Sequence, residues 1–259
     1  MLILLPPSEG KAAPARRGTP VDLDGLSLPE LTAARRKVVE ALIETSARPD
    51  AGTILGLAGG QLDDLQLNLR LLEQPVRPAG TIYTGVLYDA LDLAGLSPTG
   101  RRRARKDVRV QSALWGPITI GDRIPPYRLS IGTNLPGVGP LAGYWRQQTR
   151  GVVDTIGDGQ LIIDCRSSGY ATAWRPERTE KLIKVGAVTE NDGKRTVVSH
   201  FAKHTRGAVA RLLLEADRAP RTPEQAAEIV SAAARCELTG PDRSGWELTV
   251  ITDPAGRWD

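Results

Sequence analysis

Short apolar runs, each ending in a polar or glycine-containing loop, most limit how this chain can fold. Three of them, at residues 2–5, 108–114 and 161–165, have the length and the apolar content of buried strands. Stretches with helical spacing of apolar residues separate them. The sequence therefore predicts an α/β or mixed α+β protein, with a single domain over residues 1–259, a central mixed sheet and a helical insertion at about 28–78.

The other elements follow from apolar spacing and from end signals. Ser97-Pro98 and Thr222-Pro223 each predict a helix start, because a hydroxyl residue caps the helix and proline fits its first turn. Asn191-Asp192-Gly193 predicts a hairpin turn. The expected helices cover residues 28–45, 86–93, 141–148, 208–215 and 222–234. The further expected strands cover residues 80–83, 127–131, 180–188, 196–201 and 247–252.

The charge balance allows anionic ligands without requiring nucleic acid. The net charge is +4 and the calculated pI is about 9.2, which is mildly basic. The two cysteines, Cys165 and Cys236, match no metal or redox motif, and Cys165 is expected to be a buried thiol. The apolar start of the chain is cut off by Pro6-Pro7 and predicts a strand rather than a signal peptide. No run approaches the roughly 20 apolar residues of a membrane span, so we expect a cytoplasmic protein without a membrane partner.

The segment from Ser199 to Arg211 carries the strongest candidate for anion binding. A strand is expected to lead into it and a helix out of it, which places Lys203, Arg206 and Arg211 around a strand-to-helix junction. Helix N-termini attract anions, so three cations beside one would form a phosphate or carboxylate site. The alternative is a solvated helix face that merely carries basic residues.

Three further loops follow expected strands, where α/β sheets bind ligands. After the first strand, Ser8 can donate a hydrogen bond and Lys11 can supply a point charge, although a plain Pro-Gly loop explains both. The other predicted ligand-binding residues are Thr84, Gly85, Arg128, Ser167 and Ser168. For Thr84 and Gly85 the alternative is a helix cap beside a tight turn, and a hydrolase role for Ser168 is disfavoured because no elbow glycine precedes it.

Three other features bear on nucleic acid or metal binding. The glycine-rich break at Gly56, Gly59 and Gly60 invites a helix-hairpin-helix interpretation, and the run Arg101-Arg102-Arg103 is either a DNA contact or a solvated helix face. Asp63-Asp64 opens the next helix, and carboxylates disfavour DNA phosphate there. His200 and His204 lack the further ligands of a zinc site, so no structural metal is expected.

The chain resembles the YaaA family of peroxide-stress proteins, and its actinobacterial branch in particular. The resemblance rests on the apolar start followed by a lysine, Tyr83-Thr84-Gly85, Pro126-Tyr127-Arg128-Leu129, Trp145, and Ala202-Lys203-x-x-Arg206-Gly207, in this order over nearly the whole chain. It implies a cytoplasmic protein that limits oxidative damage, with a mixed α/β fold, a basic cleft and a helix-hairpin-helix that binds DNA. Related actinobacterial members are described as ATP-dependent ligases that join nitrogen-containing substrates.

By position, the resemblance carries Lys11, Arg128, Lys203 and Arg206 over to the cleft, and the DNA-binding hairpin to about residues 55–72. The acidic start of the second hairpin helix departs from a DNA-binding surface.

Two hypotheses follow. In the first, the protein is an ATP-dependent ligase: Lys11, Lys203 and Arg206 hold the phosphates of ATP, and Arg128 orients a small acid. Mg²⁺ neutralises the phosphates with Glu9 or Asp164 as ligands, and the activated acid is captured by a nitrogen nucleophile. In the second, a stress protein binds double-stranded DNA through the hairpin and Arg101, Arg102 and Arg103. We favour the enzyme, because basic residues at strand ends outnumber those on the hairpin.

Overall fold

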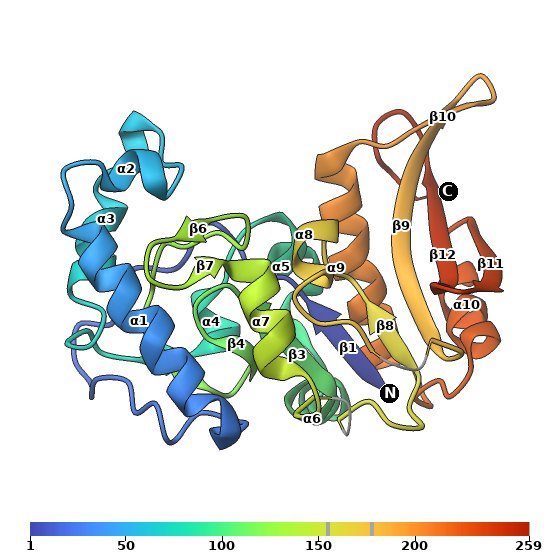
Figure 1. The fold of residues 1–259 in the computed structure, drawn as a ribbon. Coiled ribbons are helices and arrows are strands. Elements are labelled where there is room, and N and C mark those ends of the chain that lie inside the picture. The colour runs from blue at the N-terminus through green and yellow to red at the C-terminus, as the bar shows by residue number, and fades with distance from the viewer. Residues whose placement is uncertain (154–155, 177–178, 259) are drawn as a thin grey trace.

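A central mixed sheet organises the molecule. The computed structural model describes residues 1–153, 156–176 and 179–258. Within them, eight strands share one sheet, in which β10 (Lys194–Thr196) pairs only with β9 (Figure 1). The order of the others is β11 (Cys236–Asp242), β12 (Gly245–Thr252), β9 (Leu182–Asn191), β8 (Ile162–Asp164), β1 (Leu2–Leu5), β3 (Val108–Ser112), β4 (Gly116–Thr119).

The middle of the sheet is parallel and its two edges are antiparallel. Strands β12, β9, β8, β1 and β3 run parallel to one another, whereas β11, β4 and β10 pair antiparallel with β12, β3 and β9. All four residues of β1 are buried, as expected for a strand covered on both faces. The predicted strands at 2–5, 108–114, 161–165, 180–188 and 247–252 are confirmed, and so is the mixed α/β class.

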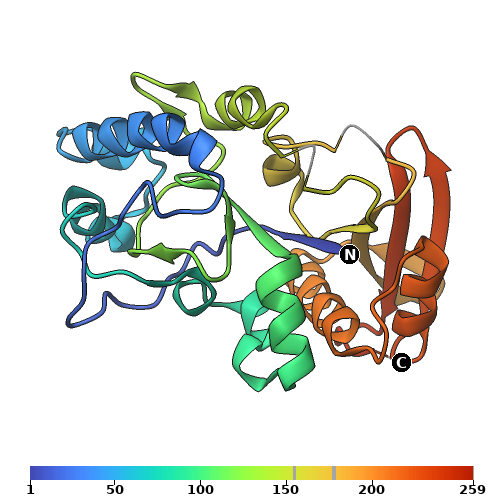
Figure 2. The ribbon, with the colours of Figure 1, turned by 90° about the horizontal axis from the view of Figure 1, so that it is seen from below.

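Helices cover both faces of the sheet. On one face lie α5 (Val86–Leu91), α6 (Pro98–Asp107), α9 (Ser199–Glu215) and α10 (Pro223–Ser231). On the other face lie α7 (Leu141–Thr149) and α8 (Ser168–Ala171), as Figure 2 shows. The expected caps form: the Ser97 hydroxyl accepts the Gly100 N–H and the Thr222 hydroxyl accepts the Gln225 N–H. None of the helices in the described residues is both long and apolar enough to cross a membrane.

A close helix crossing holds α5 against α9. A Cβ built on Gly207 would lie 2.0 Å from the carbonyl oxygen of Leu87. Only glycine allows the two helices to approach this closely, so helix packing requires a glycine at position 207. The crossing positions α9 over the sheet.

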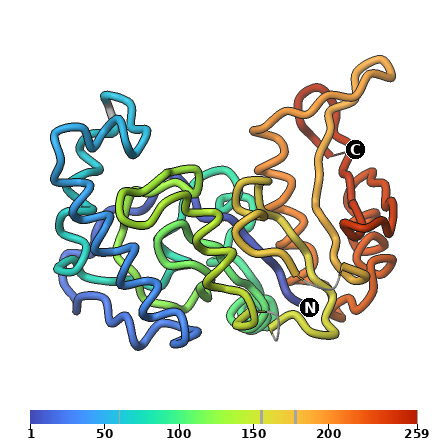
Figure 3. Tube along the Cα trace, viewed as in Figure 1, coloured from blue at the N-terminus to red at the C-terminus, as the bar shows by residue number. Residues whose placement is uncertain are grey.

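The segment at 28–78 extends from one end of the molecule, as the blue-to-cyan trace in Figure 3 shows. Its elements are η1 (Pro29–Leu31), α1 (Thr32–Ser46), α2 (Ala51–Ile54), η2 (Gly59–Gln61), α3 (Asp64–Leu69) and β2 (Arg77–Pro78), which pairs with β5 (Arg123–Ile124). Buried Arg35 of α1 donates to the carbonyls of Trp115 and Pro117 beside β4, at 2.9 and 3.2 Å. The helical character of this segment, with a break near Gly59, is confirmed.

Three sequence predictions are wrong. Residues 80–82 belong to a single helical turn, α4 (Ala79–Ile82), and Tyr83 forms only an isolated antiparallel bridge with Lys11, because both edges of β1 are already taken by β3 and β8. Residues 127–131 form no strand, since side chains rather than a strand satisfy the Arg128 backbone. Of the strand expected at 196–201, only Thr196 is in a strand, at the end of β10, because helix α9 begins at Ser199. The hairpin turn is confirmed, with Asp192 and Gly193 both at positive φ.

Candidate functional site

The strand order places a topological switch point between β1 and β8, the position at which α/β sheets form a crevice for ligands. These strands are parallel neighbours, with Leu4 beside Asp164. From β1 the chain reaches β3 on one side, whereas from β8 it continues to β9 on the other. Where connections diverge in this way, the carboxyl ends of the strands leave room for a ligand. The loops that follow β1 and β8 therefore border the candidate site.

Lys11 lies in the loop after β1, over two aromatic rings. Its Nζ is 4.2 Å from the ring centroid of Tyr127 and 5.8 Å from that of Tyr83. It donates to the carbonyls of Ser8 at 2.9 Å and Glu9 at 3.3 Å. Burial, followed by the nearby Arg128 charge, lowers the pKa of Lys11 to about 7, although the Asp64 and Glu9 carboxylates act in the opposite direction. The amine therefore exchanges its proton near neutral pH.

Four of the chain's five tyrosines interact with one another here, and two of them, Tyr83 and Tyr127, lie under the lysine. The Tyr127 hydroxyl lies 3.2 Å from that of Tyr83 and 2.6 Å from that of Ser112, and the Tyr88 hydroxyl donates to the Pro6 carbonyl at 2.7 Å. Burial raises the pKa of Tyr83, Tyr88 and Tyr127, and that of Tyr170 to about 12. The floor of the site is therefore uncharged and aromatic.

Arg128 supplies a second cation at the mouth of the site. Its backbone N–H donates to the buried Asn68 side chain at 2.8 Å, and its carbonyl accepts from the same amide at 2.9 Å. Its guanidinium lies 3.8 Å from the Glu9 carboxylate, which is 81% exposed while the Arg128 side chain is 16% exposed. A carboxylate this exposed and this distant neutralises the guanidinium only weakly.

Ser8 and Thr84 join the loop after β1 to the start of α5. The Thr84 N–H donates to the Ser8 hydroxyl at 3.0 Å, and that hydroxyl donates to the Gly10 carbonyl at 2.5 Å. Gly85, with φ of 92°, then turns the chain into α5. The structure thus brings Ser8, Glu9, Lys11, Thr84 and Arg128 together, with Gly85 adjacent.

An ion pair shapes the other border of the crevice. Buried Asp164 accepts from the Arg166 Nε and Nη2 at 2.9 and 2.8 Å, and the Arg166 guanidinium lies over the Trp174 ring. Both Asp164 oxygens therefore already bind a cation. Cys165 is buried, as expected, and burial raises the pKa of its thiol to about 12.

Ser167 and Ser168 lie exposed at the start of α8. In the part of the chain that the structure describes, no three His, Cys, Asp or Glu residues form a metal-binding group.

The three cations predicted at a strand-to-helix junction lie instead within helix α9. The Arg206 Nε donates to the Val185 carbonyl at 3.0 Å, and the Arg206 charge partly offsets the raised pKa of Cys165, so this residue adjoins the end of β8. Lys203 is exposed to solvent one turn earlier. Arg211 donates to the carbonyls of Leu91, Asp92 and Gly95 and so ties α9 to the end of α5. The junction between strand and helix lies upstream of these cations, because β10 ends at Thr196 and α9 already begins at Ser199.

The residues predicted for DNA binding do not share one surface. Gly56, at φ of 64°, and Gly59 lie near α2 and η2 with open space beside them, and Gly60 continues η2. Arg101, Arg102 and Arg103 lie on α6, in a different part of the molecule (Figures 1 and 2). Arg101 donates to the Leu96 carbonyl, Arg103 binds carbonyls at the end of α9, and Arg102 is exposed.

Sequence reasoning missed Asn68, Asp64, Tyr83, Tyr88 and Tyr127 as parts of the site. Tyr83 and Tyr127 belong to two motifs that carry the family resemblance, Tyr83-Thr84-Gly85 and Pro126-Tyr127-Arg128. Neither tyrosine was predicted to line the site. Asn68 carries no local signal, since its partner lies 60 residues away in the chain.

Comparison with known proteins shows relatives along nearly the whole chain. The model of the family described as peroxide stress protein YaaA matches residues 1–232. A UPF0246 protein of Streptomyces coelicolor is 44% identical, over 97% of this chain and 98% of the relative. UPF0246 proteins of Corynebacterium efficiens and Corynebacterium glutamicum are 40% and 38% identical, over 90% and 97% of this chain and 93% and 100% of the relatives.

Proposed function

The chain belongs to the YaaA family of peroxide stress proteins, and on that premise we propose that its Lys11 site binds a nucleotide and serves an ATP-dependent ligase. In this proposal the enzyme activates a small acid, which then couples to a nitrogen nucleophile. The observation that carries the proposal is the pair of poorly neutralised cations, Lys11 and Arg128, at the point where strand connections diverge.

An anion would relieve an electrostatic cost at this site. The Arg128 charge disfavours the Lys11 ammonium, and so does burial. A phosphate between the two cations would attract both and would be held in surroundings of low dielectric constant. The aromatic floor excludes water without adding charge, because Tyr83 and Tyr127 remain protonated.

The roles follow from the chemistry of each group. Lys11 holds a phosphate of ATP as a point charge, and the Arg128 fork holds the carboxylate of the acid. The acid oxygen attacks phosphorus and forms a mixed anhydride while pyrophosphate or ADP leaves. The amine then attacks the acyl carbon and releases AMP or phosphate. Lys203 and Arg206 add positive charge from α9. Such catalysis consists mainly of positioning and charge stabilisation.

Mg²⁺ fits this site only in part. Glu9 offers an exposed carboxylate, whereas Asp164 is paired with Arg166. Magnesium commonly binds through one or two carboxylates together with substrate phosphates, and there it neutralises phosphate charge. We therefore assign Glu9 rather than Asp164 as the protein ligand, with the phosphates of ATP supplying the rest.

Calorimetric titration of Mg-ATP tests the proposal, with wild type, Lys11→Met, Arg128→Gln and the control Lys194→Met. Lys194 is an exposed residue of β10, away from the crevice. We expect one-to-one binding that Lys11→Met and Arg128→Gln weaken at least tenfold and that Lys194→Met preserves. Absence of heat with folded wild-type protein would refute the nucleotide site.

DNA binding is the competing hypothesis, and a parallel titration with duplex DNA tests it. If Mg-ATP does not bind but duplex DNA does, with affinity that falls steeply with salt, the stress-protein hypothesis replaces the ligase. This hypothesis has less support, because the acidic Asp64 opens helix α3 of the hairpin and because Arg101, Arg102 and Arg103 lie on α6, in a different part of the molecule.

A further inference from the structure

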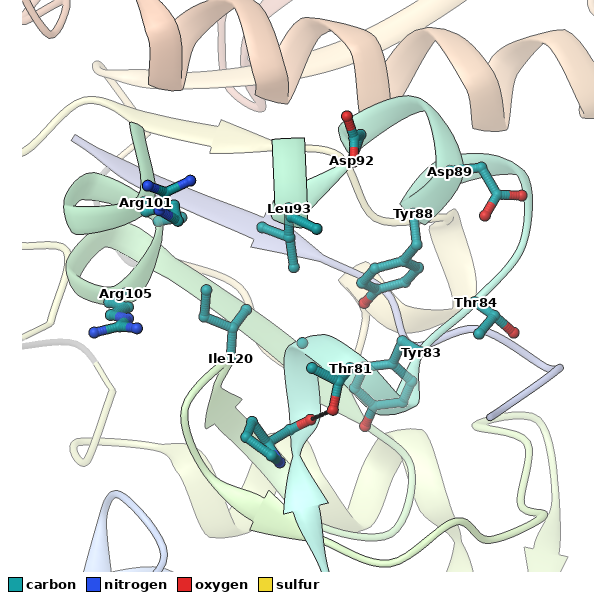
Figure 4. A pocket seen from close by; sticks show the side chains of 14 residues that line it. Thr81, Tyr83, Thr84, Tyr88, Asp89, Asp92, Leu93, Arg101, Arg105 and Ile120 are labelled. Carbon is teal, nitrogen blue, oxygen red and sulfur yellow. Dashed lines mark hydrogen bonds between the residues drawn. The ribbon is translucent and has the colours of Figure 1, made fainter. Parts of the chain in front are cut away.

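A pocket of about 660 Å³ lies beside the Lys11 site, between α4, α5, η3 (Leu93–Gly95) and α6; we refer to it as the α6 pocket. Figure 4 shows its principal side chains, which include Thr81, Tyr83, Tyr88, Leu93, Arg101 and Arg105. Its volume falls within the range of small-molecule sites, roughly 300–1,000 Å³. We infer that the α6 pocket binds an organic phosphate monoester with a flat apolar body. This inference does not depend on the proposed ligase.

One end of the pocket is basic. Arg101 and Arg105 are four residues apart on α6 and therefore lie on the same side of the helix. Both also line a shallower hollow of about 470 Å³ with Arg102 and Lys106. No salt bridge holds Arg105 among the residues that the structure describes. Two guanidinium groups side by side suit the several oxygens of a phosphate.

The two acidic residues that line the pocket do not neutralise Arg101 and Arg105. Asp92 pairs with Arg211 at 3.1 Å, so its charge is already matched. Asp89 points away from the arginines in Figure 4. The positive charge at the α6 end is therefore available to a ligand.

The remaining walls are apolar and aromatic. Ile120 and Ala104 are buried at the base, with 9% and 1% exposure, and Leu93 projects into the space from η3 (Figure 4). The Tyr88 ring is 7% exposed and borders the same space. An apolar lining with basic side chains at only one end selects a ligand that has an anionic head and an apolar body.

The test uses 1-naphthyl phosphate, which combines a phosphate head with a flat ring system. Its binding is measured by calorimetry and by NMR contacts to the methyl groups of Leu93 and Ile120. Three comparison ligands separate the parts of this probe. Inorganic phosphate has only the anionic head, 1-naphthol has only the ring system, and 1-naphthoate has a carboxylate in place of the phosphate. The variant is Arg105→Gln. The matched control is Arg102→Gln, which makes the same charge change on α6 outside the pocket.

We expect saturable one-to-one binding with contacts to both methyl-bearing residues. Arg105→Gln should weaken it at least tenfold, because a charge-assisted contact is lost, while Arg102→Gln should change it less than twofold. Naphthoate and each half-ligand should bind at least tenfold more weakly. Thr81→Trp, which fills the pocket from exposed Thr81, should block binding in a protein with unchanged circular dichroism.

Three results would overturn the inference. Equal losses in Arg102→Gln and Arg105→Gln, or equal affinity for inorganic phosphate, would show a diffuse basic surface. Loss of naphthyl phosphate binding in Lys11→Met would place the probe in the Lys11 site instead. Retained probe binding in that variant, with Mg-ATP binding lost, would establish two separate sites.

Discussion

At the residue scale, Lys11 shows how burial changes the chemistry of an amine. Its ammonium rests on the Tyr127 ring and two carbonyls, yet loss of hydration dominates and lowers its pKa to about 7. A lysine in this state responds strongly to a neighbouring anion, which would raise the pKa again. The folded protein retains this group at a cost, which is typical of functional sites.

This cost predicts a pH dependence of stability. The unfolded pKa of lysine is about 10.4, so above pH 7 the unfolded chain binds more protons at Lys11 than the folded chain does. The free energy of unfolding should therefore rise from pH 7 to about 8.5, by at most roughly 1.4 kcal/mol per pH unit from this group. Above that range the raised pKa of Cys165 acts in the opposite direction, because the folded thiol keeps its proton.

Urea denaturation between pH 6.5 and 8.5 measures this effect in wild type and Lys11→Met. The variant should lose most of the rise, since the methionine side chain has similar length and no titrating group. Identical slopes in the two proteins would contradict the lowered pKa of Lys11.

The Asp164–Arg166 pair is the second buried charge at this scale. The Arg166 side chain is 1% exposed, so Asp164→Asn would leave it without a counter-charge. We expect destabilisation of about 3–5 kcal/mol in chemical denaturation. The exposed pair Arg48–Asp50 provides the control, because Asp50→Asn should have no measurable effect. Similar losses in both variants would show that burial of Arg166 carries no such cost.

At the scale of elements, the crossing of α5 and α9 depends on one missing side chain. A methyl group at Gly207 cannot fit against the Leu87 carbonyl, so the helices would have to separate. The crossing matters for the site, since α5 begins at the Thr84-Gly85 turn and α9 carries Arg206.

Gly207→Ala should therefore destabilise the protein by about 1–3 kcal/mol despite the better helix propensity of alanine. Gly143 in α7 has no neighbour within 4 Å of a built Cβ, so Gly143→Ala should stabilise by about 0.5–1 kcal/mol. Thermal or urea denaturation compares the two. Stabilisation by both substitutions would mean that the crossing tolerates a side chain.

At the scale of the whole molecule, the helical segment 28–78 and the sheet meet at the candidate site. Asn68 of α3 binds both backbone groups of Arg128 and replaces the strand partner that this segment lacks. Asp64 of the same helix acts on the Lys11 charge. This helical segment thus supports Arg128 and adds a negative charge that acts on Lys11.

Asn68→Ala should therefore weaken Mg-ATP binding up to about tenfold by freeing the Arg128 backbone, since each lost hydrogen bond is worth about 1 kcal/mol. Exposed Gln66 on the same helix gives the matched control, Gln66→Ala. Titration of the folded variants checks this. Equal affinity in both would show that Arg128 is positioned without Asn68.

The sequence by itself determined the elements whose signals are local. Apolar runs placed β1, β3 and β8, the hydroxyl-proline pairs placed the starts of α6 and α10, and Asp192-Gly193 placed a hairpin turn. It also picked out Lys11 and Arg128, although not their tyrosine floor.

Only the tertiary structure decided what those elements do together. Residues 80–83 and 127–131 have strand-like composition, yet the first forms a helical turn and the second pairs its Arg128 backbone with the Asn68 side chain. Arg206 and Arg211 share a helix but bind different neighbours. β8 pairs with the edge of β1 that β3 leaves free, and this pairing produces the switch point between β1 and β8. Pairing across more than 150 residues depends on how whole faces pack, and no short stretch of sequence encodes it.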